Sequence, residues 1–374
     1  MSGLYLHIPF CKQACNYCNF HFSTSLKQKD ALLAALHLEL EQRAVGWHHP
    51  LQTVYFGGGT PSLLSATEIN ALWRTIEQHY QLLPNMEVTL EANPDDLTPN
   101  YVQSLRDTPI NRFSIGIQSF FEEDLQWMNR AHNAEQARAC LEIAKSAGFE
   151  QLTIDLIYGS PTTSQERWAA NLAMAFELKV PHLSCYALTV EPNTALAHQI
   201  KVGKRQAVDD THAAEQFDYL LEQIVVHGYE QYEISNFCLP PNYAQHNSNY
   251  WTGAPYLGVG PAAHSFDGQN RRWNVAHNLQ YIKAVHANTV YWEQEQLTVQ
   301  DQHNEYIMTA LRTKWGVDRN RLAQWGAEVL PAFETQAQRY LERGWLEQRA
   351  ERYVLTNQGK FLADAIISDF FWTD

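Results

Sequence analysis

The sequence of 374 residues has no apolar stretch near the roughly 20 residues that a membrane-spanning helix needs. It also has no signal peptide, because its first residues run directly into a strand-like pattern, so we expect a cytoplasmic protein. Basic residues are few: 27 Lys and Arg stand against 41 Asp and Glu, for a formal net charge of -14. This charge repels a phosphate backbone, so we expect no nucleic-acid partner. The sequence leaves peripheral contact with a membrane as a possible interaction.

Cysteine pairs of the kind that build a disulfide framework are also missing. Of the six cysteines, Cys11, Cys15 and Cys18 lie within one short run, and the others are scattered singly. This distribution is typical of a metal site. Cys140 and Cys185 lie in apolar patterns, where a cysteine usually behaves as a small buried hydrophobe.

The first half of the chain alternates strand-like runs, rich in β-branched and aromatic residues, with stretches of helical period. Such alternation predicts an α/β fold made of parallel βαβ units with right-handed crossovers. Six units are too few for a closed eight-stranded barrel, so we expect a partial (β/α)6 barrel. The predicted strands cover 4–8, 53–56, 87–90, 112–117, 152–157 and 183–188, and the predicted helices cover 28–43, 66–80, 135–147 and 165–178.

The pattern changes in the second half of the chain. After a predicted helix at 209–227, the segment 239–274 is rich in Pro, Asn and aromatic residues, and we expect it to be irregular and therefore functional or mobile. Three predicted helices and a two-strand run at 346–355 then indicate a winged-helix-like module, for which the acidic composition favours a structural or docking role over DNA binding. The expected parts are a partial barrel over 1–240, a connecting segment over 241–298 and a helical, winged-helix-like C-terminal domain over 299–374.

The three clustered cysteines form Cys-x3-Cys-x2-Cys in the loop after the first predicted strand. A curled loop brings cysteines at this spacing to one side, where they can bind three irons of a 4Fe-4S cluster and leave the fourth iron open. The open iron can chelate S-adenosylmethionine (SAM), and an electron from the reduced cluster then cleaves the sulfonium C–S bond to give a deoxyadenosyl radical. The alternative is a zinc site completed by His7 or His21. Structural zinc favours repeated Cys-x2-Cys pairs, which this sequence lacks.

Further motifs follow in order along nearly the whole chain. They read His-Ile-Pro-Phe-Cys, Tyr-Phe-Gly-Gly-Gly-Thr-Pro, Glu-Ala-Asn-Pro, Arg-Phe-Ser-Ile-Gly-Ile-Gln-Ser-Phe, Asp-Leu-Ile-Tyr-Gly and Leu-Gly-Val-Gly-Pro-Ala-Ala-His-Ser. With these motifs the sequence resembles the radical SAM family of oxygen-independent coproporphyrinogen III oxidases and their relatives, and most closely the HemW branch of heme chaperones.

The resemblance also implies a SAM site. A glycine run lets the amino group of a ligand approach backbone carbonyls closely, and the resemblance implies that Gly58, Gly59 and Thr60 hold the methionyl end of SAM. Tyr5 is expected to point from the first strand toward the cluster loop. Each of the remaining residues also has an ordinary explanation as a strand-end or helix-surface polar group, and His264 as a structural histidine. Those that match SAM-contacting or pocket-lining positions of the family are Glu91, Gln118, Arg130, Asp155, Ala187 and His264.

Two departures separate the sequence from the oxidases and match the chaperone branch. Phe20 stands where the oxidases carry a further cysteine, and the long segment that precedes their first strand has no counterpart here. In addition, His-Asn-Ser-Asn-Tyr-Trp at 246–251 matches the heme motif of the branch. The resemblance thus implies heme as a third cofactor, with His246 as axial ligand and aromatic neighbours as flat apolar walls. Alternatively, His246 belongs to the wall of the SAM pocket or to a packed loop.

The favoured function is therefore heme binding and delivery to apo-hemoproteins, with a protein as heme donor and with the cluster and SAM in a structural or regulatory role. The alternative is a radical SAM oxidase that acts on coproporphyrinogen III or another tetrapyrrole. A third hypothesis is a radical SAM enzyme for an unrelated substrate. The two departures make oxidative decarboxylation the less expected activity.

Overall fold

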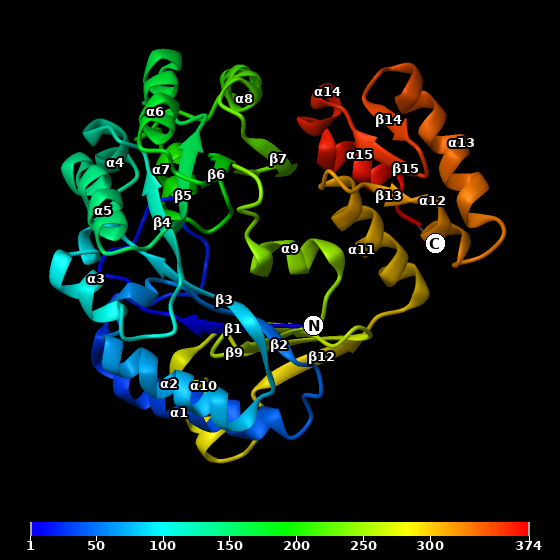
Figure 1. The fold of residues 1–374 in the computed structure, drawn as a ribbon. Coiled ribbons are helices and arrows are strands. Elements are labelled where there is room, and N and C mark those ends of the chain that lie inside the picture. Colours follow the sequence, from blue (N-terminus) through cyan, green and yellow to red (C-terminus); the bar gives the residue numbers. More distant parts are fainter. Residues whose placement is uncertain (1, 373–374) are drawn as a thin grey trace.

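The computed structural model describes residues 2–372 and shows an α/β fold built on one twelve-stranded sheet (Figure 1). Six strands pair in parallel, each beside the one before it in the chain. All six strands predicted from the sequence are present. They are β1 (Ser2–Ile8), β2 (Leu51–Gly58), β3 (Leu82–Ala92), β4 (Arg112–Gln118), β5 (Gln151–Tyr158) and β6 (His182–Ala187).

Successive residues of these strands enter two different environments. In β1, Leu4, Leu6 and Ile8 have no exposed surface and belong to the main hydrophobic core, whereas Tyr5 lines a cleft on the opposite, concave face of the sheet. Side chains alternate between the two faces of a strand, so a core residue at every second position leaves the intervening position for the concave face. The polar residues of β2 to β5 follow the same alternation.

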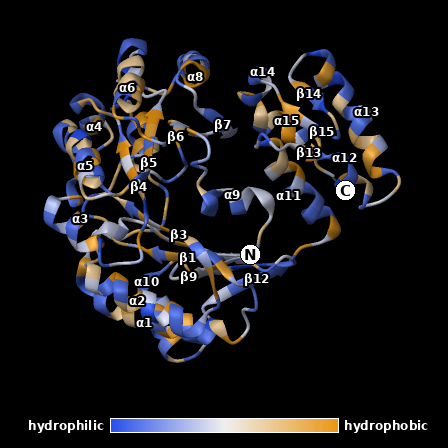
Figure 2. Ribbon diagram, in the orientation of Figure 1, coloured by the Kyte–Doolittle hydropathy of each residue, from blue (hydrophilic) through white to orange (hydrophobic). Residues whose placement is uncertain are grey.

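Helices cover the outer face of the sheet and bury the apolar residues of the strands. Figure 2 shows hydrophobic strands inside a layer of helices whose outer surfaces are largely hydrophilic. Capping boxes start two of the helices, α2 at Ser65 and α5 at Asn133, where a side-chain oxygen accepts a hydrogen bond from a free backbone N–H. The covering helices are α1 (Lys29–Ala44), α2 (Ala66–His79), α3 (Pro99–Leu105), α4 (Glu122–Trp127), α5 (Ala134–Ser146), α6 (Gln165–Glu177) and α8 (Asp210–Val226).

The segment 239–274 is not irregular, so that prediction was wrong. It contains one helix and three short strands, and these strands extend the sheet beyond β1. Strand ladders satisfy its backbone polar groups, which the aromatic and Asn-rich composition did not reveal. The sheet therefore runs on through the predicted connecting segment. The elements are α9 (Gln245–Thr252), β9 (Tyr256–Val259), β10 (His264–Phe266), β11 (Asn270–Asn274), α10 (Asn278–His286) and β12 (Trp292–Gln296).

The sheet does not close into a barrel. Its order is β12-β11-β10-β9-β1-β2-β3-β4-β5-β6-β8-β7, so β12 and β7 form its two edges. Two short strands, β7 (Glu230–Glu233) and β8 (Asn236–Cys238), pair antiparallel beyond β6. Helix α9 contacts β1, β2 and α11 (Val299–Leu311), and Figure 1 shows it between the sheet and the C-terminal part of the chain.

The C-terminal part, called here the C-terminal module, has a hydrophobic core of its own made of residues between Tyr306 and Phe370. A three-stranded antiparallel sheet packs with five helices, in agreement with the winged-helix-like pattern expected from the sequence. The elements are α11 (Val299–Leu311), β13 (Val317–Asp318), α12 (Arg319–Ala323), α13 (Val329–Glu342), β14 (Leu346–Arg349), β15 (Arg352–Leu355), α14 (Asn357–Lys360) and α15 (Ala363–Asp369).

Across residues 2–372, every helix falls short of the length or the apolar character that crossing a bilayer demands.

Candidate cofactor site

A cleft opens on the concave side of the sheet, at the carboxyl ends of the parallel strands, and the C-terminal module forms part of its wall. Its volume is about 850 Å³, which falls in the usual range of small-molecule sites, about 300 to 1,000 Å³. The structure brings all the predicted cofactor residues to this cleft except His246 and His264. The residues concerned are Tyr5, Cys11, Cys15, Cys18, Gly58, Gly59, Thr60, Glu91, Gln118, Arg130, Asp155 and Ala187.

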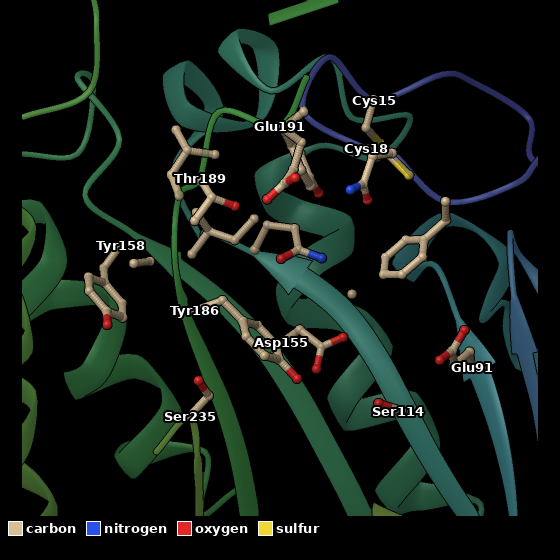
Figure 3. Close-up of a pocket in the computed structure, with 18 of the residues that line it drawn as sticks. Cys15, Cys18, Glu91, Ser114, Asp155, Tyr158, Tyr186, Thr189, Glu191 and Ser235 are labelled. Carbon is tan, nitrogen blue, oxygen red and sulfur yellow. The ribbon is translucent and has the colours of Figure 1, made fainter. Parts of the chain in front are cut away.

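The cluster loop, residues 9–25, connects β1 to the first helices and carries all three predicted iron ligands. Figure 3 shows Cys15 and Cys18 together at one end of the cleft. Burial raises the pKa of Cys11 to about 11, so this thiol needs a positive centre such as iron to ionise. No three His, Cys, Asp or Glu side chains within residues 2–372 already form a converged metal-ligand set. The loop brings the three cysteines near one another, but their thiolates converge fully only when they bind iron.

The zinc alternative receives no support from His7 or from His21, one of which would have to complete the site. The Nδ1 atom of His7 lies 3.0 Å from the Tyr5 hydroxyl, and its Nε2 atom lies 3.0 Å from the carbonyl oxygen of His21. The Nε2 atom of His21 lies 2.7 Å from the side-chain oxygen of Asn278. Three of the four ring nitrogens are thus engaged in hydrogen bonds with the protein.

The glycine run has a packing role that the sequence did not predict. Gly58 has a positive φ of 116°, and a Cβ atom there would lie 2.8 Å from the ring of His7. A Cβ atom at Gly59 would lie 2.7 Å from the Phe10 carbonyl oxygen and 3.0 Å from the sulfur of Cys11. The glycines therefore let β2 approach β1 and the cluster loop, whether or not SAM is bound. Loss of SAM binding in a Gly58→Val variant would thus not prove that the ligand occupies this space.

Two carboxylates, Glu91 and Asp155, face the cleft from β3 and β5 (Figure 3). Glu91 accepts hydrogen bonds from the Tyr55 hydroxyl at 2.8 Å and from the Gly58 backbone N–H at 3.0 Å. Burial raises the pKa of both carboxyl groups to about 7. Neither group has a Lys, Arg or His nitrogen within 4.0 Å among the described residues. A bound sulfonium or ammonium group would supply the missing positive charge.

Arg130 is held at the cluster end of the cleft by several hydrogen bonds. It donates to the Cys15 sulfur at 3.3 Å, to the Asn93 side-chain oxygen at 2.7 Å and to the Gly116 carbonyl at 2.8 Å. Its Nε atom is buried and has no hydrogen-bond partner within residues 2–372. Buried donors are normally paired, so this N–H is available to an acceptor on a ligand. Gln118 lies nearby with a positive φ of 65°, a strained conformation that is enriched at functional sites.

The residues at this end of the cleft therefore fit the predicted pair of cofactors. Thiols, carboxylates without a cationic partner and an unpaired guanidinium N–H match the needs of an iron cluster and of the sulfonium, ammonium and carboxylate groups of SAM.

His246 does not line the cleft but lies behind its wall, and it is 2 % exposed. Its ring stacks on Tyr55 at a centroid distance of 4.8 Å. The Nδ1 atom lies 2.8 Å from the Thr53 hydroxyl, and the Nε2 atom lies 2.9 Å from the Tyr250 hydroxyl. Both ring nitrogens are therefore engaged, and burial lowers the pKa of His246 to about 3, so the ring is neutral. A neutral imidazole can ligate iron, but only after one of these hydrogen bonds breaks.

A floor layer of polar residues anchors α9 beneath the cleft: Thr53, Glu87, Arg112, Thr153 and His246. Glu87 accepts hydrogen bonds from the backbone N–H groups of Gln245 at 2.9 Å and of His246 at 2.8 Å. Arg112 lies 3.7 Å from the Glu87 carboxylate and donates to the Thr153 hydroxyl at 2.8 Å. The sequence analysis did not identify Glu87 or Arg112. The available signal was a charged residue in each of two buried parallel strands, where apolar residues are the norm.

His264 is not placed to bind a cofactor in this conformation. It is exposed on β10, and its ring stacks on Trp273 at a centroid distance of 6.2 Å. It is absent from the residues that line the cleft.

Comparison with known proteins matches two parts of the chain to family models. Residues 5–175 match the radical SAM superfamily, and residues 297–362 match the HemN C-terminal domain. Curated heme chaperones named HemW are 36% identical over 98% of this chain and 93% of the protein in Mycobacterium tuberculosis, and 30% identical over 99% of both chains in Bacillus subtilis. The structure of HemN, the coproporphyrinogen III oxidase of Escherichia coli, superposes with a TM-score of 0.84 over 99% of this chain and 89% of that chain, at 24% identity.

The fold, the cysteine loop and the matched models define a radical SAM protein with a HemN-type C-terminal domain. This superfamily is defined by a 4Fe-4S cluster and SAM as cofactors. Similarity along almost the whole chain narrows the assignment further. The chain belongs to the HemW family of heme chaperones.

Proposed function

We propose that this protein binds heme and delivers it to apo-hemoproteins in the cytoplasm, after receiving the heme from a donor protein. The observation that carries this proposal is the similarity to curated heme chaperones, which extends over 98% of the chain and includes the C-terminal module.

We further propose that Cys11, Cys15 and Cys18 hold three irons of the cluster. Glu91 and Asp155 supply the negative charges that face the sulfonium and ammonium groups of SAM, and Arg130 binds its carboxylate. Gly58, Gly59 and Thr60 shape the backbone beside the cluster, while Tyr5, Gln118 and Ala187 complete the wall. When bound, these cofactors provide reversible one-electron chemistry.

His246 is the proposed axial ligand of heme, and the structure indicates what ligation requires. The bond between Nε2 and the Tyr250 hydroxyl lies within α9, so a rearrangement of this one helix can free the nitrogen. Trp251 lies at the other end of α9, where the Arg312 guanidinium stands 5.5 Å from its ring, and Arg312 lines the cleft. A shift of α9 would therefore bring the heme motif toward the cleft.

The second candidate is a radical SAM oxidase that acts on coproporphyrinogen III or another tetrapyrrole. The observation that favours it is a cleft in which the predicted SAM residues lie together beneath a HemN-type C-terminal domain. Phe20 is evidence against the oxidase candidate, because an exposed phenyl group, 69 % accessible, lies where the oxidases carry a further cysteine.

One experiment separates the two candidates. Reconstituted protein with SAM and reductant is incubated either with coproporphyrinogen III or with heme and an apo-hemoprotein. We expect no protoporphyrinogen IX, together with a Soret band on the chaperone that moves to the acceptor. Turnover of coproporphyrinogen III without heme transfer would favour the oxidase.

A further inference from the structure

The cleft continues beyond the predicted SAM residues toward the C-terminal module. Figure 3 shows Tyr158 and Ser235 on the side away from Cys15 and Cys18. This part, called here the module end, has a wall that combines residues of the barrel with residues of α14, α15 and their neighbourhood. The members used below are Phe217, Ile234, Arg312, Lys360, Phe361 and Asp364.

Lys360 is the unusual group at the module end. Its ammonium donates to the side-chain oxygens of Gln231 at 2.6 Å and of Asn357 at 3.0 Å, and both of these acceptors are neutral. No carboxylate lies within 4.0 Å of it in the described part of the chain. An ammonium has three N–H groups, so one of them stays available. Burial, with repulsion from Arg349, lowers the pKa of Lys360 to about 8 against the opposing attraction of Glu347, which reflects the cost of burying this charge without a directly paired carboxylate.

The two other cations of the cleft are already neutralised or engaged. Arg312 pairs with Glu233 at 3.4 Å and with Asp364 at 2.8 Å. Arg130 lies at the cluster end, in contact with Cys15. Its unpaired N–H faces the proposed SAM site, so at the module end Lys360 is the cation best placed to gain from an anionic ligand.

Apolar surface borders this cation. Phe361 is 45 % exposed, which is high for a phenyl group, and its ring lies 6.2 Å from that of Phe217. Ile234 adds an aliphatic wall, and Tyr186 is 42 % exposed nearby. Large apolar side chains left open beside an unneutralised ammonium match a ligand that is mostly flat and apolar and carries a carboxylate at its edge.

We propose that the module end of the cleft is the binding site for the tetrapyrrole cargo, with Lys360 as the partner of one of its carboxylates and with the exposed ring of Phe361, backed by the buried ring of Phe217, as the wall against the macrocycle. This inference rests on the proposed function and adds the location and chemistry of the cargo site. It assigns a binding role to the C-terminal module, which supplies the ammonium and one of the two phenyl rings. Binding of the macrocycle at this site does not depend on which residue ligates the heme iron.

The test uses protoporphyrin IX, which lacks iron and so removes any contribution from His246, together with its dimethyl ester, which lacks the carboxylates. Affinities are measured by tryptophan quenching in the full-length protein. We expect the diacid to bind roughly tenfold more tightly than the ester, as for one charge-assisted hydrogen bond. Lys360→Gln should remove this preference by weakening diacid binding alone, whereas Lys360→Arg should retain it. Lys314→Gln is the matched control, because Lys314 pairs with Glu230 and does not line the cleft.

The outcomes distinguish the site from the function. If the protein binds heme and both porphyrins but Lys360→Gln leaves the preference unchanged, the proposed site is wrong and the chaperone function stands. If neither porphyrin nor heme binds, both proposals are wrong. SAM also carries a carboxylate, so its affinity is measured in the same variants. A loss of SAM affinity in Lys360→Gln with an unchanged porphyrin preference would assign Lys360 to SAM and overturn the inference.

Discussion

The concave face of the sheet carries two layers of polar residues on the same strands, and they differ in how their charges are compensated. In the floor layer, both oxygens of Glu87 accept hydrogen bonds from α9, and Arg112 stands 3.7 Å away. In the cleft above it, the carboxyl groups of Glu91 and Asp155 have no Lys, Arg or His nitrogen within 4.0 Å among residues 2–372, and burial raises the pKa of each to about 7. A buried charge with a partner inside the protein holds a structural element in place, whereas a buried charge without such a partner can be neutralised by a bound ligand.

The largest expected effect concerns the cluster end of the cleft. Cys15→Ala should abolish cluster assembly, because one iron loses its anionic ligand and the cluster becomes accessible to solvent. Anaerobic reconstitution should give about four irons per chain in the native protein and far fewer in the variant. Cys140→Ala is the control, since Cys140 is buried within α5 away from the cleft and should leave the iron content unchanged. A zinc-only metal content would contradict the cluster assignment.

The floor layer should respond in stability. Glu87→Gln leaves Arg112 buried without its counter-charge and weakens the anchor of α9, so we expect a loss of about 3 kcal/mol in the free energy of unfolding. Urea unfolding measures this loss. Glu68→Gln is the matched control, because Glu68 also accepts a backbone N–H at a helix start and pairs with Lys29 but is only partly buried, and we expect it to cost below about 1 kcal/mol. Equal losses in the two variants would show that Glu87 is an ordinary cap.

His246 tests whether the floor layer also serves heme. His246→Ala should shift or weaken the Soret band and lower the heme affinity by about tenfold. It should also slow heme transfer to an apo-hemoprotein, while the absorption of the iron–sulfur cluster stays unchanged. His264→Ala should change neither property, since His264 is exposed and outside the cleft. If heme binds equally well without the His246 imidazole, His246 is a structural residue of the floor layer and the ligand lies elsewhere.

The smallest expected effect is the pH dependence of stability that the cleft carboxylate Asp155 contributes. The pKa of Asp155 in the folded chain, about 7, is above the value of an exposed aspartate, so the native state holds a proton that the unfolded state releases. Without SAM, the contribution of Asp155 to the stability of the native protein therefore falls as the pH rises from about 4 to 7. Asp155→Asn should be more stable than the native chain by about 1 kcal/mol at pH 8, since Asp155 is only partly buried, and equally stable near pH 4.

Added SAM should reverse this order at pH 8. The cofactor supplies the missing positive charge to the native carboxylate, so it should stabilise the native chain more than Asp155→Asn. Equal thermal shifts with SAM in both proteins would exclude Asp155 from the SAM site.

Much of the fold was predictable because parallel strands and their helices carry strong local patterns. All six strands were predicted, and the helix predicted at 209–227 corresponds to α8. The segment 239–274 was not, since its strands are very short: β9 depends on pairing with the distant strand β1, and β10 pairs with its neighbours β9 and β11. Short strands with weak alternation depend on their partners, which a local pattern does not contain.

The cleft residues were predicted as a set because they occur in motifs at strand ends, and the fold brings strand ends to one edge. Their environments were not predictable. Gly58 and Gly59 were expected to make room for SAM, and the structure shows that they also make room for His7 and the cluster loop. Lys360 carried no motif at all, and its position beside the cleft depends on how the C-terminal module packs on the barrel.

The sequence by itself determined the class of protein: the spacing of Cys11, Cys15 and Cys18, the order of the strand-end motifs and the strand–helix alternation are local properties of the chain. Only the tertiary structure decided which polar groups are compensated. It paired Glu87 with α9, engaged both nitrogens of His246 and gave the Lys360 ammonium two neutral hydrogen-bond partners. Charge compensation depends on distance and burial in three dimensions, and residues far apart in the chain supply both.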